Sequence, residues 1–184
     1  MLNIFLESNI LIDHFCFAGE HFCSSELIKK IPNSSEFKAW TSDYILSETL
    51  GKMKDIYEEK KGLKGALRET IPKSDISKMV QILEDFKRTP NLDTMKAEID
   101  SKAVYEKVRD LCIETKDAPV VLSVLELQEK LRRQVKLVTA DMKLFVRAKK
   151  NLRTLHPSFH LHKCPSNCKT YYFCKNRDRY TSPF

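Results

Sequence analysis

The stretch that decides the fold is MLNIFLESNILID, residues 1–13. Residues 2–6 are almost entirely apolar, as in a strand buried at the centre of a sheet, and apolar residues from Ile10 onward recur at roughly helical spacing. Glu7 stands where the strand gives way to the helix, and open α/β sheets place their ligands at the carboxyl ends of strands. Glu7 is therefore a candidate site residue. The alternative is that Glu7 or Asn9 caps the following helix.

Length and composition exclude several classes of protein. The 184 residues fit one domain, or one domain with a small appendage. No apolar run reaches about 18 residues, which predicts that no segment spans a membrane. The first residues lack the pattern of a signal peptide. Cys16, Cys23 and Cys112 stand singly in apolar surroundings, which is typical of reduced thiols in a cytoplasmic protein.

The positive charge is concentrated at the end of the chain. The net charge is +7, and residues 142–184 carry ten Lys or Arg against one acid, a net of +9. The remaining 22 basic and 24 acidic residues give residues 1–141 a net charge of −2. This asymmetry favours a polyanionic partner, most simply a nucleic acid. The alternative is a solvated basic tail that only aids solubility.

The pattern along the chain alternates strands and helices. Such alternation predicts a parallel sheet with helices on both faces. The predicted strands cover 2–6, 37–41 and 135–140. One predicted helix begins near residue 9, and others cover 21–30, 43–60, 74–88, 93–114 and 117–131. Ser42 is the predicted N-cap of the helix over 43–60, and Asp141 opens one more helix.

Acidic residues recur at the boundaries of these elements. Glu7 ends the first strand, Asp141 follows the last one, and Asp117 precedes a buried helix. Each could simply be a helix cap. Together they favour a cluster of carboxylates, which repel one another unless a divalent cation such as Mg²⁺ or Mn²⁺ binds between them.

Four stretches resemble, in order, the four motifs of PIN-domain ribonucleases. They are IFLESNILID (4–13), SDYILSETL (42–50), KDAPVVLSVLEL (116–127) and LVTADMKLF (137–145). The resemblance implies an acidic site of Glu7, Glu48, Asp117 and Asp141 that holds Mg²⁺ or Mn²⁺, supported by Asn9 and Thr139. It also implies an α/β fold in which helices flank a central parallel sheet, with a nuclease domain over residues 1–155 and a C-terminal extension over 156–184.

The sequence departs from the family pattern at Glu7, where the family has Asp. The additional methylene moves the carboxylate by about 1.5 Å, and Mg²⁺ tolerates poor ligand geometry badly. Helical phase places Glu48 away from the apolar face of its helix and predicts that it is exposed to solvent. Asp13 and Asp43 are second-rank site candidates because each adjoins a motif.

The C-terminal extension contains a dense group of potential zinc ligands. Four ligands of this kind close a tetrahedral Zn²⁺ site. The candidates are His160, His162, Cys164, Cys168 and Cys174. If residues 160–164 are extended, the two histidines and Cys164 project to one face. The alternative is a loose, reduced tail whose cysteines lie close together by coincidence.

Cations and aromatic rings alternate around these ligands. Rings stack on unpaired bases while Lys and Arg contact phosphates. The predicted RNA-binding residues are Lys169, Tyr171, Tyr172, Lys175, Arg177 and Arg179. The alternative is that the ring cluster packs on the body of the protein as a C-terminal latch.

These features predict a divalent-metal-dependent endoribonuclease that cleaves RNA phosphodiesters with water as the nucleophile. The alternative function is a catalytically weak or inactive PIN-like scaffold that binds RNA. The expected partners are RNA, an antitoxin-like protein and a second copy of the chain. The expected location is the cytoplasm.

Overall fold

The protein is built on a five-stranded parallel sheet, seen in a computed structural model that describes residues 1–17, 22–58, 76–97, 115–141, 144 and 160–163. The strand order is β3-β2-β1-β4-β5, and every neighbouring pair is parallel. The strands are β1 (Leu2–Leu6), β2 (Phe37–Ser42), β3 (Leu92–Met95), β4 (Val135–Thr139) and β5 (His160–Lys163). The predicted α/β class is confirmed.

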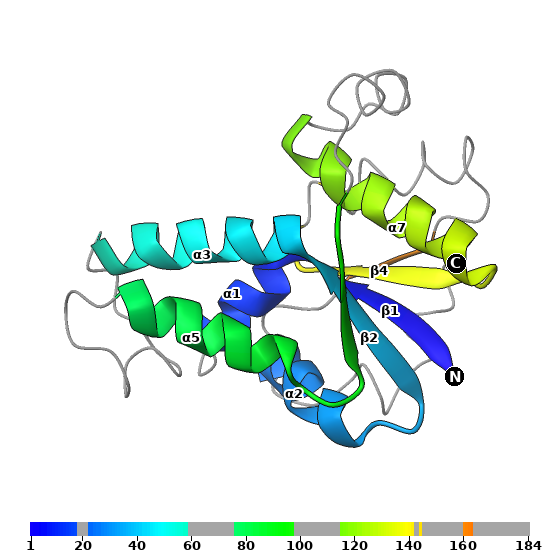
Figure 1. The fold of residues 1–184 in the computed structure, drawn as a ribbon, viewed down its shortest axis with the longest axis horizontal. Helices are drawn as coiled ribbons and strands as arrows, with labels where there is room; N and C mark the ends of the chain where they lie inside the picture. Colours follow the sequence, from blue (N-terminus) through cyan, green and yellow to red (C-terminus); the bar gives the residue numbers. More distant parts are fainter. Residues whose placement is uncertain (18–21, 59–75, 98–114, 142–143, 145–159, 164–184) are drawn as a thin grey trace.

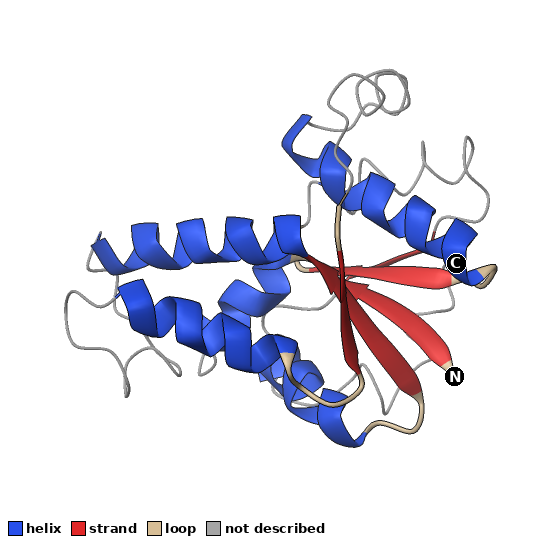
Figure 2. Ribbon diagram, in the orientation of Figure 1, coloured by secondary structure: helices blue, strands red, loops and turns tan. Residues whose placement is uncertain are grey.

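Helices connect the strands and cover the sheet (Figure 1). The α-helices are α1 (Ser8–Phe17), α2 (Phe22–Lys30), α3 (Asp43–Glu58), α5 (Ile76–Lys87) and α7 (Ala118–Leu131), and short 3₁₀ turns lie at Ile31–Asn33 and Thr115–Asp117. Helix α1 packs against α2 and α3, α3 runs beside α5, and α7 packs beside β4. In Figure 2 the strands turn progressively relative to one another, which is the usual twist of such a sheet.

The centre of the core is β1. Ile4, Phe5 and Leu6 are fully buried although successive side chains of a strand point to opposite faces. A strand that is buried on both faces is typical of parallel sheets with helices on each side. The predicted N-cap of α3 is also confirmed, because the Ile45 amide donates a hydrogen bond to Ser42 Oγ over 3.3 Å.

The order of the strands places a crevice beside β1. β1 pairs with β2 on one side and with β4 on the other. From β1 the chain first adds β2 and β3 on one side of the sheet and later adds β4 and β5 on the opposite side. Parallel sheets open at such a point, beyond the carboxyl ends of the strands, and ligands bind there. Glu7 directly follows β1, and Asp141 lies two residues beyond β4.

One predicted helix is wrong at its beginning. A helix was expected from about Asp93, but residues 92–95 form β3, which pairs with β2 through Ala39–Leu92 and Ser42–Met95. Leu92 and Met95 are buried in the sheet, and four residues are too few to show strand periodicity among charged neighbours. The rest of this prediction, residues 98–114, lies outside the described part of the chain.

The fifth strand comes from residues assigned by sequence to the C-terminal extension. β5 pairs with β4 from Lys136–His160 to Thr139–Lys163, so the backbone of 160–163 is extended as the zinc argument required. The predicted boundary between residues 155 and 156 stays a prediction. Leu144 is helical, but most of the helix expected after Asp141 lies outside the described residues.

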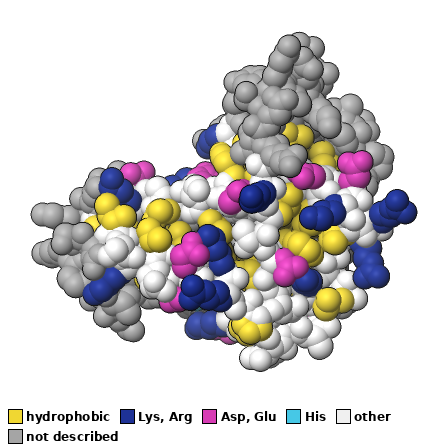
Figure 3. All heavy atoms as spheres, in the orientation of Figure 1, with side chains coloured by type: hydrophobic (Ala, Val, Ile, Leu, Met, Phe, Trp, Pro, Cys, Tyr) yellow, Lys and Arg dark blue, Asp and Glu magenta, His cyan; other side chains and the backbone are white. Residues whose placement is uncertain are grey.

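The buried cysteines and the charges on the surface match the predictions from the sequence. Cys16 and Cys23 are buried thiols, as predicted, while Cys112 lies outside the described residues. The face in Figure 3 carries cations and anions interspersed, in keeping with the nearly neutral charge of residues 1–141. Among the described helices, none has the length and apolar character needed to cross a membrane.

Candidate active site

A cavity of about 340 Å³ opens beyond the carboxyl ends of β1 and β4. It brings together all four acids of the predicted site, although they come from four distant parts of the chain. The lining residues are Glu7, Asn9, Asp13, Glu48, Lys52, Lys116, Asp117, Ala140 and Asp141. We refer to this cavity as the acidic pocket.

A hydrogen-bond network joins Glu7 to the end of β4. Asn9 Nδ2 donates to Glu7 Oε2 over 2.9 Å and contacts Thr139 Oγ1 at 3.2 Å. Asn9 Oδ1 in turn accepts from the Ala140 amide over 3.0 Å. The side chain of Asn9 therefore ties β1 to β4 across the floor of the pocket. Asn9 lies inside the first turn of α1 and not before it, and the predicted role of Asn9 and Thr139 as supporting residues near a metal stays a prediction.

The surroundings of Glu7 disfavour the ionised form of its carboxyl group. Its side chain is only 5 % exposed, and burial raises the pKa of its carboxyl from 4.5 to about 7. The value of about 7 is the net result: burial raises the pKa most, hydrogen bonds from Thr139 and Asn9 lower it, and the negative charges of Asp141 and Asp117 raise it by smaller amounts. The three carboxylates therefore interact electrostatically across the pocket.

Asp117 sits at the start of α7, where sequence allowed a capping role. It occupies the N-cap position before a first turn that contains Pro119, yet its side chain makes no capping hydrogen bond to α7. The side chain is 9 % exposed and lines the pocket. Its charge also reaches Tyr44, whose pKa is raised by burial and then by Glu48 and Asp117.

Glu48 is not the solvent-exposed residue that helical phase predicts. Its side chain is 23 % exposed and lines the pocket, because α3 crosses the carboxyl edge of the sheet and turns this flank toward Glu7. Glu48 Oε1 lies 2.8 Å from Lys52 Nζ. Lys52 and Lys116 are pocket residues that sequence reasoning missed. The i,i+4 spacing of Glu48 and Lys52 could have indicated that Lys52 lies beside Glu48.

Asp141 has the geometry of a helix cap and also lines the acidic pocket. Its Oδ1 accepts a hydrogen bond from the Leu144 amide over 3.2 Å, the geometry of a helix cap. Its own amide donates to Thr139 Oγ1 over 2.9 Å, and the residue lines the acidic pocket. Capping thus holds one carboxylate oxygen in place at the rim of the pocket.

The two second-rank acids have different positions. Asp13 lines the pocket, is 8 % exposed and accepts a hydrogen bond from Ser24 Oγ over 2.8 Å. Asp43 does not line it. Its Oδ1 accepts from the amides of Tyr44 and Ala97, each over 2.8 Å, and so joins the start of α3 to the segment after β3.

The donor chemistry of the acidic pocket fits a hard divalent cation. Carboxylate oxygens are the ligands that Mg²⁺ and Mn²⁺ prefer, and such a cation would stabilise the ionised form of Glu7, which burial disfavours. The acids do not form a closed cage. Within the described ranges, no group of three or more His, Cys, Asp or Glu side chains is arranged to hold a metal ion.

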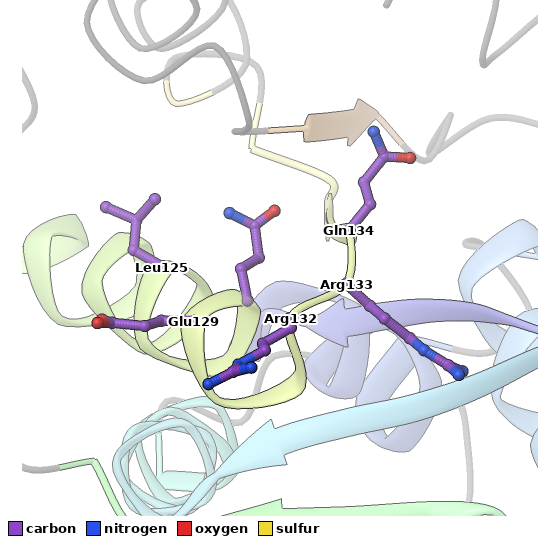
Figure 4. Close-up of a pocket in the computed structure, with 6 residues that line it drawn as sticks. Leu125, Glu129, Arg132, Arg133 and Gln134 are labelled. Carbon is purple, nitrogen blue, oxygen red and sulfur yellow. The ribbon is translucent and has the colours of Figure 1, made fainter.

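A second cavity, of about 410 Å³, lies at the opposite end of β4 (Figure 4). Leu125, Glu129, Arg132, Arg133 and Gln134 line it together with Gln128. Arg132 ends α7 in the left-handed conformation, with φ 49°. Cations at a helix C-terminus balance the negative end of the helix dipole, which explains both arginines without a ligand.

Most of the predicted site residues in the C-terminal extension lie outside the described part of the chain. The backbone of His160 and His162 belongs to β5. The predicted zinc ligands Cys164, Cys168 and Cys174 lie outside the described residues, as do the predicted RNA-binding residues Lys169, Tyr171, Tyr172, Lys175, Arg177 and Arg179.

Comparison with known proteins places the fold. No family model matches the chain, and no curated protein matches it. A chain of VapBC2 from Rickettsia felis, solved bound to a DNA fragment from the promoter, superposes with a TM-score of 0.50 at 14 % identity over 89 % of this chain and 100 % of that chain. The toxin of VapBC2, VapC, is a PIN domain. The fold is PIN-like. At this identity the similarity concerns the fold alone, and the PIN-like sheet places its carboxyl edge, with Glu7 and Asp141, at the acidic pocket.

Proposed function

We propose that the protein is a divalent-metal-dependent endoribonuclease and that the acidic pocket is its active site. The observation that carries the proposal is the convergence of Glu7, Glu48, Asp117 and Asp141 on one cavity at the switch point of a PIN-like sheet. The direct test is cleavage of a labelled RNA by the purified chain with Mn²⁺ or Mg²⁺ and with EDTA. Cleavage with Mn²⁺ or Mg²⁺ that EDTA abolishes is the expected result.

The proposed chemistry divides between the cation and the chain. When bound by the four acids, a divalent cation supplies an activated water and neutralises charge on the phosphodiester. Asn9 and Thr139 fix the orientation of Glu7, and Thr139 also orients the backbone of Asp141. The chain therefore contributes positioned carboxylates in a cavity that is large enough to admit a phosphate group.

A second function rests on a specific observation. The described acids form no ready metal site, and Lys52 already pairs with Glu48. A PIN-like scaffold that binds RNA without cutting it fits this arrangement. RNA binding without cleavage, at any concentration of Mn²⁺ or Mg²⁺, would favour the scaffold and exclude the nuclease.

Restoring the family residue at position 7 tests whether the longer side chain limits activity. In Glu7→Asp the carboxylate withdraws by about 1.5 Å, toward the position that the PIN resemblance implies. We expect faster RNA cleavage, or activity with a wider choice of metals, because Mg²⁺ demands close to ideal ligand distances. Initial rates with Mg²⁺, Mn²⁺ and Co²⁺ measure the effect. Equal turnover of wild type and Glu7→Ala would show that Glu7 has no role at the metal.

The basic C-terminal extension is proposed to supply RNA affinity. Truncation after Lys163 keeps all of β5 and removes four cations, Lys169, Lys175, Arg177 and Arg179. Each phosphate contact releases counterions, so the slope of log affinity against log salt should become shallower by up to about 3. Fluorescence anisotropy with a single-stranded RNA at several salt concentrations measures the slope. An unchanged slope would remove the binding role.

We also propose that this extension holds one structural Zn²⁺ through three of its cysteines and one histidine. A segment as short as this extension cannot bury enough apolar surface to fold by itself and needs a cross-link such as a bound metal ion. Elemental analysis of protein purified without added metal should find about one zinc per chain. Protein without zinc would contradict the proposal.

The proposed partners follow from the same comparison. VapBC2 is a toxin–antitoxin complex, which supports an antitoxin-like partner for this chain, while RNA as a partner follows from the proposed activity. Self-association and a cytoplasmic location stay predictions from the sequence.

A further inference from the structure

Asp43 and Tyr44, the first two residues of α3, are hydrogen-bonded to two other segments of the chain. Asp43 Oδ1 accepts a hydrogen bond over 2.8 Å from the amide of Ala97, which follows β3, and another over 2.8 Å from the amide of Tyr44. Tyr44 Oη donates over 3.3 Å to the carbonyl oxygen of Lys116, in the 3₁₀ turn before α7. The start of α3 therefore joins the segment after β3 to the turn that carries Asp117.

The sequence after Lys116 excludes the hydrogen bond that a 3₁₀ turn would supply to its carbonyl. In a 3₁₀ turn the carbonyl of one residue accepts from the amide three residues later. Here that later residue is Pro119, which has no N–H group to donate. The side chain of Asp117 makes no capping hydrogen bond to α7 either. The hydroxyl of Tyr44 thus fixes the turn from another element, at the residue directly before Asp117.

Tyr44 is close to two acids of the pocket. Glu48 lies one helical turn after Tyr44 on the same flank of α3, and both Glu48 and Asp117 line the acidic pocket. Burial raises the pKa of the Tyr44 phenol, and the charges of Glu48 and Asp117 raise it further, as nearby negative charges do. The same helix start therefore carries Glu48 into the pocket and holds the turn that carries Asp117 there.

We propose that Asp43 and Tyr44 are positioning residues of the acidic pocket, which hold the turn before α7 so that the Asp117 carboxylate keeps one orientation. Neither residue lines the pocket, so both act through Asp117. Asp43 thereby serves as a hydrogen-bond acceptor and not as a further acid of the site. The inference rests on the proposed function only for its effect on RNA cleavage, because the orientation of Asp117 can be measured without RNA or metal.

The first test is Tyr44→Phe, which removes only the hydroxyl. In the metal-free protein, NMR couplings across the Cα–Cβ bond of Asp117 should report one rotamer in wild type and averaged rotamers in Tyr44→Phe. With labelled RNA and Mn²⁺, kcat should fall about fivefold at unchanged KM, the effect of losing one hydrogen bond that orients a reacting group. Tyr57→Phe is the matched control, because Tyr57 also lies on α3 and its hydroxyl has no hydrogen-bond partner in the described structure. It should match wild type in both measurements.

A pair of substitutions at Asp43 separates the acceptor from the charge. The amide oxygen of Asp43→Asn can accept the hydrogen bonds from Tyr44 and Ala97. This variant should keep one Asp117 rotamer and the kcat of wild type. Asp43→Ala accepts no hydrogen bond and should show the averaged rotamers of Tyr44→Phe. An equal loss of cleavage in Asp43→Asn and Asp43→Ala would show that the charge of Asp43 matters and would overturn its positioning role.

The outcomes separate this inference from the proposed function. Equal Asp117 couplings in wild type and Tyr44→Phe overturn the inference, whether or not the wild type cleaves RNA. Averaged rotamers in Tyr44→Phe with the kcat of wild type overturn the effect on the reaction. Averaged rotamers in Tyr44→Phe, when not even the wild type cleaves RNA, support the positioning role and remove the nuclease. Circular dichroism of each variant confirms that its fold is kept.

Discussion

Replacing Asp141 by Asn is expected to abolish divalent-dependent RNA cleavage while the protein keeps its fold. Asp141 lies where β4 ends at the acidic pocket, and its charge raises the pKa of Glu7. The neutral amide cannot supply the charge that holds a divalent cation, and loss of metal stabilisation worth several kcal/mol lowers the rate about a hundredfold or more. Asp117→Asn should have the same effect, because Asp117 faces the same pocket from the start of α7.

The fold should survive both substitutions for physical reasons that differ at the two positions. In Asp141→Asn the amide oxygen can still accept the hydrogen bond that the Leu144 amide donates to Asp141 Oδ1. The side chain of Asp117 makes no capping bond to α7, so α7 loses no cap. Removing one charge from interacting carboxylates should slightly raise the melting temperature of the metal-free protein.

A matched control and a clear contradiction complete this experiment. Asp55→Asn neutralises an exposed acid on α3, the helix that carries Glu48, and Asp55 does not line the pocket. Its rate should equal that of wild type in a labelled-RNA assay with Mn²⁺. RNA cleavage that persists in both pocket variants would show that the nuclease site lies elsewhere or that a contaminant cuts the RNA.

The sequence predicted the elements that carry strong local signals. The apolar run 2–6, the N-cap Ser42 and the buried helix after Asp117 each became the expected element. β3 was missed because a four-residue strand has no readable period, and because its burial depends on pairing with β2, which lies about fifty residues earlier in the chain. Non-local pairing of that kind has no local signature.

The acids of the candidate site were predictable from the sequence, but its two lysines, Lys52 and Lys116, were not. Glu7, Asp117 and Asp141 stand at boundaries of elements, where parallel topology brings side chains together. The orientation of Glu48 depends on how α3 crosses the sheet edge, so helical phase alone gave the wrong exposure. Lys52 enters the pocket for the same reason.

Glu7→Gln is expected to stabilise the metal-free protein by about 3 kcal/mol at pH 8 and by almost nothing near pH 4.5. The ordinary pKa of a glutamate is 4.5, and burial raises that of Glu7 to about 7 in the folded protein. Between these values the folded state binds more protons than the unfolded state, so the stability of the wild type falls as the pH rises. A shift of about 2.5 pKa units corresponds to roughly 3 kcal/mol.

The glutamine side chain in Glu7→Gln is neutral at every pH, so the variant should not show this loss, and its amide oxygen can still accept the hydrogen bond from Asn9. Urea unfolding at pH 4.5, 6 and 8 measures the difference, with Glu129→Gln, an exposed carboxylate of α7, as the control. Mn²⁺ should reverse the order at pH 8, because a bound cation stabilises ionised Glu7 and has less to gain from an amide. Equal stability of wild type and Glu7→Gln at pH 8 would mean that Glu7 ionises without penalty. The charge of the acidic pocket would then be balanced by the chain itself and would not require a cation.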